Sequence, residues 1–133
     1  MKPKILIVLA DYYRDICVNM LDSTVDHIDK KSKYNLIRVP GVFEIPVTIA
    51  TRIKEYDGFI ALGCVIKGQT PHFDFISRAT TDAIMRLSVD YKKPIGNGII
   101  TCLNKKQAII RSKKKVVGLD GYGIKITKQE IIK

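Results

Sequence analysis

Residues 58–66, GFIALGCVI, form an apolar run of nine residues that contains no charged or amide side chain. Such a run is typical of a β-strand, and the lack of a polar face predicts that other elements cover both of its sides. Residues 4–9, KILIVL, form a second run of this kind after one lysine. Strands that are buried on both faces occur in parallel sheets with helical connections, so the two runs predict an α/β fold.

Strand-like and helix-like segments alternate four times along the chain. The predicted strands cover residues 4–9, 34–39, 58–66 and 95–103. The predicted helices, which have apolar residues at helical spacing, cover residues 16–28, 45–53, 71–91 and 105–111. Asn104 is a suitable N-cap for the last of them. This alternation predicts a three-layer α/β/α sandwich around a four-stranded parallel sheet.

The length and composition predict a single domain, because 133 residues that are 46% hydrophobic can bury a core. The apolar run at residues 5–10 is shorter than the core of a signal peptide, and no other run is long enough to cross a bilayer. We therefore expect a cytoplasmic protein. Cys17, Cys64 and Cys102 lack the spacing of a metal site, so we expect reduced thiols that pack as small apolar side chains.

Positive charge is concentrated near the C-terminus. The formal net charge is +10, and residues 104–133 carry nine Lys or Arg against two acidic residues. Such a segment can contact nucleic acid, anionic lipid or a phosphorylated small molecule. Because no recognition-helix pattern accompanies these charges, we expect a solvated surface with one or two phosphate contacts rather than nucleic-acid binding.

Three polar loops, at residues 11–14, 40–44 and 67–72, each follow a predicted strand. Ligands of open α/β sheets bind beyond the carboxyl ends of the strands, so one mouth can gather all three loops. The chain has no GxGxxG after the first strand, no GxxxxGK[ST] and no serine nucleophile elbow. These absences exclude the common dinucleotide, nucleoside triphosphate and serine hydrolase sites.

The third loop, KGQTPHFDF, joins the strongest strand to the longest predicted helix. With Thr70 as N-cap and Pro71 at the first helical position, backbone amides near Gly68, Gln69 and Thr70 are left unpaired at the positive end of the helix. A phosphate fits such a place. Ordinary helix capping uses the same residue types, so both interpretations stay open.

Several side chains in the loops also have two interpretations. His72 follows the possible anion site and can exchange protons near neutral pH, but a lone histidine is also a common surface or packing residue. Glu44 can bind hydroxyl groups or complement a helix dipole. Tyr12 and Tyr13 can stack on a planar ligand or pack on their own domain. His27, the other histidine, is expected on the solvated surface of the first helix.

Three blocks of the sequence resemble one enzyme family. They are PGVFEIPVTIA at residues 40–50, ALGCVIKGQTPHFDFIS at residues 61–77 and PIGNGIITCLNKKQA at residues 94–108. These blocks are similar, in order and spacing, to those of the 6,7-dimethyl-8-ribityllumazine synthases of riboflavin biosynthesis. The resemblance covers residues 4–111.

The resemblance implies a flavodoxin-like subunit and an enzyme without metal or cofactor. Its reaction condenses 5-amino-6-(D-ribitylamino)uracil with 3,4-dihydroxy-2-butanone 4-phosphate, giving 6,7-dimethyl-8-ribityllumazine, phosphate and water. The resemblance also implies a homo-oligomer, a pentamer or an assembly of pentamers, with active sites shared between subunits. It implies neither nucleic acid nor membrane as a partner.

The same resemblance assigns roles to individual residues. His72 matches the proton-transferring histidine, Gln69 and Thr70 match the loop that holds the butanone phosphate, and Arg111 matches an arginine that reaches this phosphate, usually from a neighbouring subunit. Eight further residues match positions that bind the other substrate: Tyr12, Val42, Phe43, Glu44, Cys64, Val65, Ile66 and Asn97.

Within that group, Tyr12 would stack on the pyrimidine, residues 42–44 would bind the ribityl chain, and residues 64–66 would line the heterocycle. Asn97 stands where the family often has a phenylalanine that is contributed across the subunit interface.

The chain departs from the family pattern after about residue 112, where we expect a shortened, atypical C-terminal segment of the single domain. By the resemblance, Ile110 stands where many members have an acidic residue, and Lys115 would correspond to a family lysine. This departure leaves two alternatives open: a protein of the same fold that binds flavin or lumazine without turnover, and a basic protein that uses residues 105–133 to bind nucleic acid.

Overall fold

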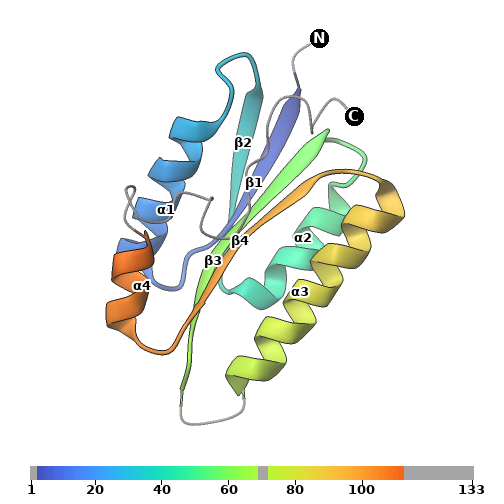
Figure 1. Cartoon of the computed structure of the whole chain (residues 1–133). Helices are drawn as coiled ribbons and strands as arrows, with labels where there is room; N and C mark the ends of the chain where they lie inside the picture. The colour runs from blue at the N-terminus through green and yellow to red at the C-terminus, as the bar shows by residue number, and fades with distance from the viewer. Residues whose placement is uncertain (1–2, 69–71, 113–133) are drawn as a thin grey trace.

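The computed structural model describes residues 3–68 and 72–112 and contains one four-stranded sheet. The strands are β1 (Lys4–Ala10), β2 (Lys33–Val39), β3 (Gly58–Ile66) and β4 (Ile95–Cys102). The helices are α1 (Arg14–His27), a 3-10 turn η1 (Val42–Glu44), α2 (Ile45–Thr51), α3 (His72–Tyr91) and α4 (Lys105–Ser112). All strand pairs are parallel, in the order β2-β1-β3-β4 (Figure 1).

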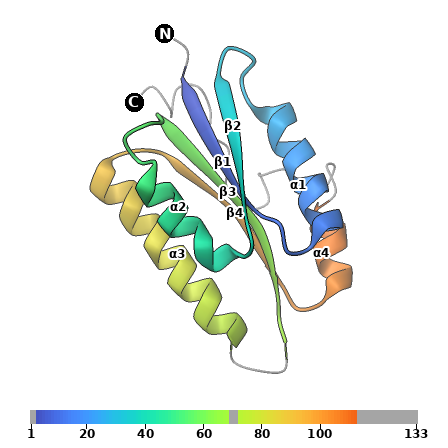
Figure 2. The ribbon, with the colours of Figure 1, turned by 180° about the vertical axis from the view of Figure 1, so that it is seen from behind.

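The sheet lies between two layers of helices, as Figures 1 and 2 show from opposite sides. α1 and α4 contact each other on one face, whereas α2 and α3 contact each other on the opposite face together with η1. This arrangement is the predicted three-layer α/β/α, flavodoxin-like fold.

β1 shows why helices must cover both faces. Ile5, Ile7 and Leu9 belong to the core under α1 and α4, while the residues between them belong to the core under η1, α2 and α3. Every residue from Ile5 to Ala10 is at most 2% exposed. β3 is divided between the two cores in the same way, so the two long apolar runs form the two interior strands of the sheet.

Most of the predicted elements are confirmed within one or two residues, and the exceptions are local. The turn η1 lies where the sequence suggested only a loop. Val47 in α2 and Tyr91 at the end of α3 are apolar side chains that remain exposed, by 60% and 49%. Val47 is exposed because it lies two residues from both Ile45 and Ile49, the buried residues of α2, and therefore on the opposite side of the helix. His27 is exposed, as predicted, and its Nδ1 lies 2.7 Å from the carbonyl oxygen of Ser23.

No helix among the described residues has both the length and the apolar content needed to cross a bilayer.

The N-terminus of α4 is fixed by two reciprocal hydrogen bonds. The side-chain Oδ1 of Asn104 accepts a hydrogen bond of 2.9 Å from the backbone N–H of Gln107. The side-chain Oε1 of Gln107 accepts one of 2.9 Å from the backbone N–H of Leu103. The predicted N-cap is thus confirmed, and it directs α4, with Arg111 in its last turn, back along β4.

Replacing this cap should destabilise the protein measurably. We expect Asn104→Ala to lower the free energy of unfolding by about 1 kcal/mol, because one N–H of the first turn loses its acceptor. Asn104→Asp keeps an acceptor and should stay close to wild type. Urea unfolding followed by circular dichroism measures the difference, and equal midpoints for Asn104→Ala and wild type would contradict this role.

Candidate active site

The carboxyl edge of the sheet is stepped rather than level. Leu9 pairs with Leu62, and β1 ends one residue later, whereas β3 continues to Ile66. The last three residues of β3 therefore extend about 10 Å past the end of β1. β4 accompanies them, since Ile66 pairs with Cys102 and the N–H of Lys67 donates to the carbonyl of Cys102 at 2.8 Å. The step leaves room beside β3 for the loops that follow β1 and β2.

The loop after β1 exposes one aromatic ring and partly buries the other. Tyr13 packs against the core under α1 and α4, and burial, together with the nearby Tyr12 and Cys64, raises the pKa of its phenol. Tyr12 is 72% exposed and meets Tyr13 edge to face, with ring centroids 4.8 Å apart. Of the two interpretations left open, packing on the domain applies to Tyr13, and Tyr12 is the ring free to stack on a ligand.

An ion cluster ties this loop to β2. The Oδ2 atom of Asp11 lies 3.4 Å from Nη1 of Arg38 and 3.9 Å from Nε of Arg14, and the backbone N–H of Asp11 donates to the carbonyl of Val39 at 2.9 Å. The sequence analysis did not identify Arg38. A cation in the second-last position of a strand, just before a polar loop, is the signal that points to it.

The loop after β2 turns into η1, which lies against the sheet. Val42 is 7% exposed and belongs to the core under α2 and α3, whereas Phe43 is 62% exposed. Glu44 is half-buried and immediately precedes α2, yet its side chain makes no capping hydrogen bond. Its carboxylate at the N-terminus of α2 suits either interpretation given above, dipole complement or hydroxyl binding.

His72 is the first residue of α3 and is exposed, with Asp74 in the same first turn. This places the imidazole on the η1 and α3 side of the carboxyl edge. Three residues of the predicted anion loop, Gln69, Thr70 and Pro71, lie outside the described residues.

The strand end that was predicted to line the heterocycle is divided between the two faces. Val65 packs with the core under α3, while Cys64 and Ile66 belong to the core under α1 and α4. The Cys64 side chain is 6% exposed, and burial followed by the neighbouring Cys102 raises the pKa of its thiol to about 12. Cys64 therefore presents a neutral, small surface at the edge. The predicted reduced, buried thiols are confirmed, because all three cysteines are free and buried.

Two predicted site residues lie apart from the others in the folded chain. Nη1 of Arg111 donates to the carbonyl of Thr101 at 3.0 Å, on the α1 and α4 side of β4, across the sheet from His72. Asn97 pairs with Ala61, five residues before the end of β4, which puts it about 16 Å from the carboxyl edge. Its Oδ1 accepts a hydrogen bond from the N–H of Ile99 at 3.1 Å. Within one chain, the loops after β1, β2 and β3 begin at the same carboxyl edge, whereas Asn97 lies away from that edge.

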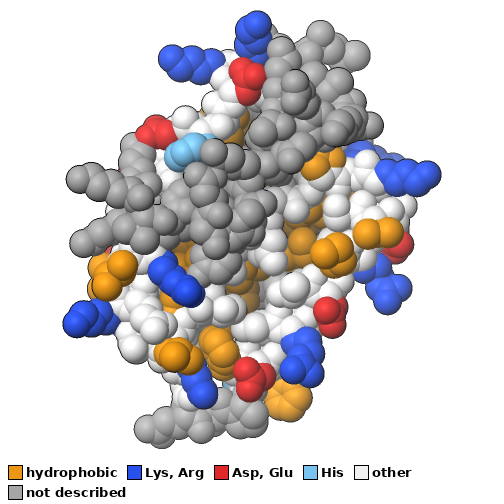
Figure 3. Space-filling model, in the orientation of Figure 1, with side chains coloured by type: hydrophobic (Ala, Val, Ile, Leu, Met, Phe, Trp, Pro, Cys, Tyr) orange, Lys and Arg blue, Asp and Glu red, His pale blue; other side chains and the backbone are white. Residues whose placement is uncertain are grey.

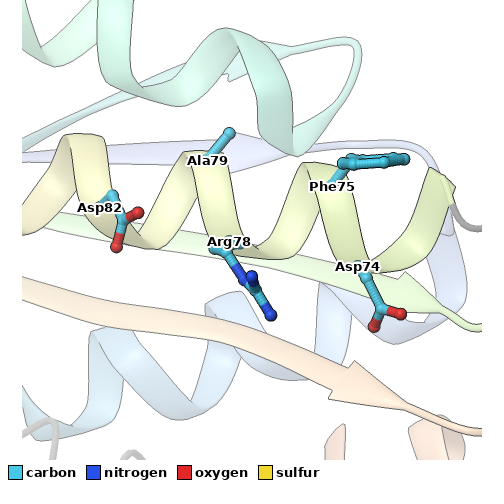
Figure 4. Close-up of a pocket in the computed structure, with 5 residues that line it drawn as sticks. All are labelled: Asp74, Phe75, Arg78, Ala79 and Asp82. Carbon is cyan, nitrogen blue, oxygen red and sulfur yellow. The ribbon is translucent and has the colours of Figure 1, made fainter.

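Two shallow hollows, of about 450 and 410 Å³, lie elsewhere, and their lining residues all come from α3. The larger is lined by Asp74, Phe75, Arg78, Ala79 and Asp82. Figure 4 shows Phe75 and Ala79 on one side of α3 and the three charged side chains on the other. These hollows belong to the outer face of α3, and we do not assign the substrates to them.

Comparison with known proteins agrees with the resemblance seen in the sequence. The family model for 6,7-dimethyl-8-ribityllumazine synthase matches residues 2–129. The chain belongs to this family. An enzyme of that name from Bartonella bacilliformis is 43% identical over 84% of this chain and 77% of its own length. The one from Agrobacterium fabrum is 40% identical over 91% of this chain and 87% of its own, and the one from Cutibacterium acnes is 37% identical over 89% and 69%.

Membership of the lumazine synthase family makes the chain a transferase of riboflavin biosynthesis. The stepped edge described above is where this fold places a ligand. In the described part of the chain, no three His, Cys, Asp or Glu side chains lie together in a way that would hold a metal ion.

The buried thiols give a testable pH dependence. Burial raises the pKa of Cys17 from 9.0 to about 11 and that of Cys64 to about 12, so the folded chain holds both thiols protonated. The stability that this contributes is complete below pH 9 and is lost as the pH rises through about 11 to 12. At about pH 8, a thiol-specific reagent should label neither residue in the folded protein but should label both in guanidinium. Labelling of the folded protein at the rate of a free thiol would contradict this assignment.

Proposed function

We propose that this chain condenses 5-amino-6-(D-ribitylamino)uracil with 3,4-dihydroxy-2-butanone 4-phosphate at the stepped carboxyl edge, releasing 6,7-dimethyl-8-ribityllumazine, phosphate and water. The observation that carries the proposal is the similarity to lumazine synthases along nearly the whole chain. The exposed His72 at the start of α3, beside the loop that would hold the phosphate, supports it.

The proposed reaction needs proton transfers and a bound phosphate rather than a covalent nucleophile. Imine formation, loss of phosphate, ring closure and dehydration each transfer a proton, and an imidazole exchanges protons near neutral pH. His72 takes this role. Gln69 and Thr70 hold the departing phosphate at the positive end of α3, with Arg111 as its cationic partner.

The second substrate is proposed to lie between the loops after β1 and β2. Tyr12 stacks on the pyrimidine, since its ring is exposed and supported from the side by Tyr13. Phe43 and Glu44 receive the ribityl chain, with Val42 as their anchor in the core. Cys64, Val65 and Ile66 form the largely apolar wall of the site.

We further propose a homo-oligomer, with five subunits as the family resemblance implies, in which Asn97 and Arg111 act in a neighbouring site. The positions of these two residues support sharing, because Asn97 is far from its own carboxyl edge and Arg111 lies across the sheet from His72. The single domain is proposed to work in the cytoplasm.

The outer face of α3 suits such self-association. Phe75, Met85 and Val89 are 69%, 63% and 64% exposed. Beside them, charges of alternating sign recur every four residues: Asp74, Arg78, Asp82, Arg86 and Asp90. Figure 3 shows acidic, basic and apolar side chains interspersed at the lower right, over α3. Alternating charges beside exposed apolar groups suit this face to contact a different face of the neighbouring subunit, as a ring of five subunits requires.

The catalytic role of His72 can be tested against the other histidine. With both substrates supplied, we expect His72→Ala to lower kcat by about 10²-fold or more, because it removes the group that moves protons. His27→Ala should keep wild-type turnover, since the contact of His27 with the Ser23 carbonyl lies within α1. Lumazine absorbance and phosphate release measure the reaction. Absence of product from the wild-type chain would refute the proposed function, and an unimpaired His72→Ala would refute the role of the histidine.

The oligomer can be tested with two matched valines. Native mass measurement of the wild type should give five chains or a multiple of five. Val89→Asp, on the outer face of α3, should shift the mass to the monomer and abolish turnover. Val18→Asp places the same charge on α1, where Val18 is 50% exposed, and should keep the oligomer. A monomeric, active wild type would contradict shared sites.

A further inference from the structure

Gly63 lies on β3 at the point where η1 comes closest to the sheet. A Cβ atom built on Gly63 would lie 2.6 Å from Cγ1 of Val42, 3.1 Å from the Cβ of Ala10 and 3.8 Å from Cδ1 of Ile45. The first of these distances is too short for two carbon atoms, so any side chain at Gly63 must displace Val42. A glycine inside an apolar strand often marks such a close approach of another segment.

The side chain of Val42 is closely packed. Its side chain is 7% exposed and is packed among buried residues on the face of the sheet under α2 and α3. Ile45, one turn further on, is fully buried over the same spot. Displacing Val42 therefore moves the whole turn η1, because close-packed side chains have no spare volume to absorb a methyl group.

The residues that follow Val42 are the ones displayed at the carboxyl edge. Phe43 is 62% exposed, and the carboxylate of Glu44 folds back over Gly41, with Oε1 3.4 Å from the position of a Cβ there. The N–H of Glu44 donates to the carbonyl of Gly41 at 3.2 Å, and its carbonyl accepts from Oγ1 of Thr48 at 2.9 Å. Both residues thus move as one body with the turn.

We propose that Gly63 is a positioning residue: the absence of its side chain sets how close the turn Val42–Glu44 lies to the sheet and thereby where Phe43 and Glu44 meet the ribityl chain. The inference rests on the function proposed above. It concerns the polyol end of one substrate and not the phosphate end of the other, since the atoms nearest to a Cβ at Gly63 belong to Val42, Ala10 and Ile45.

The distinguishing experiment is Gly63→Ala with steady-state kinetics for each substrate. The added methyl group should raise the KM for the ribitylamino-pyrimidine about tenfold, equivalent to about 1.4 kcal/mol of binding. The KM for the butanone phosphate should change less than about twofold. Val42→Ala in the Gly63→Ala background removes the clashing Cγ1 and should restore most of the lost affinity.

A second variant approaches the same contact from the other partner. Val42→Leu leaves β3 intact but lengthens the side chain that lies on Gly63, so it should also raise the KM of the ribitylamino-pyrimidine selectively. It keeps the test decisive should Gly63→Ala fold poorly. Ile49→Ala is the matched control, because Ile49 is buried on the same face but lies in α2 away from the turn. At similar loss of melting temperature, Ile49→Ala should leave the ratio of the two KM values unchanged.

The outcomes separate this inference from the proposed function. Unchanged KM values in both Gly63→Ala and Val42→Leu, or an equal rise for both substrates that Ile49→Ala reproduces, would overturn the positioning role while wild-type turnover stands. Failure of Val42→Ala to improve Gly63→Ala would also overturn it. A wild-type chain that forms no lumazine would overturn the proposed function, and the inference with it.

Discussion

The two interior strands, β1 and β3, are buried on both faces, and the rest of the molecule is arranged to satisfy that requirement. Neither strand has a polar side that water could cover, so helices must lie on each face, and parallel strands need crossover connections to supply them. Parallel strands also end at the same edge. The loops after β1, β2 and β3 therefore begin at one carboxyl edge, which is where we propose that the substrates bind.

The depth of the proposed site depends on small side chains in the sheet. Ala10 and Gly63 are small neighbours on the face under η1, and they let the turn Val42–Glu44 rest directly on the sheet. The wall formed by Cys64 and its neighbours is uncharged, because burial keeps the thiol protonated. Polar and exposed aromatic side chains are supplied instead by the segments that follow the strands, with Glu44 in η1, His72 at the start of α3 and Tyr12 in the loop after β1. A rigid apolar strand end with adaptable polar loops around it suits a reaction that binds two small molecules and transfers protons between them.

Much of this was predictable because it depends on local patterns. The strands were predicted almost to the residue, since an unbroken apolar run has no other stable place than a buried sheet. The cap at Asn104 was predicted because capping depends on residues three apart in sequence. The exposure of Val47 was not, although its position two residues from Ile45 and Ile49 places it on the opposite side of α2. The pairing of Asp11 with Arg38 was missed for another reason, since the two residues are far apart in sequence and are brought together only by the register of β1 and β2.

The sequence by itself determined the fold class, the order of the elements, the family and the edge at which the loops gather. All of these follow from periodicity, turn chemistry and ordered blocks, which are properties of neighbours along the chain. Only the tertiary structure decided that Tyr12 and not Tyr13 is exposed, that Asn97 and Arg111 lie away from His72, and that Val42 rests on Gly63. These are facts about distances between segments far apart in sequence, and packing sets them, because a side chain takes whatever position its neighbours in the folded core leave open.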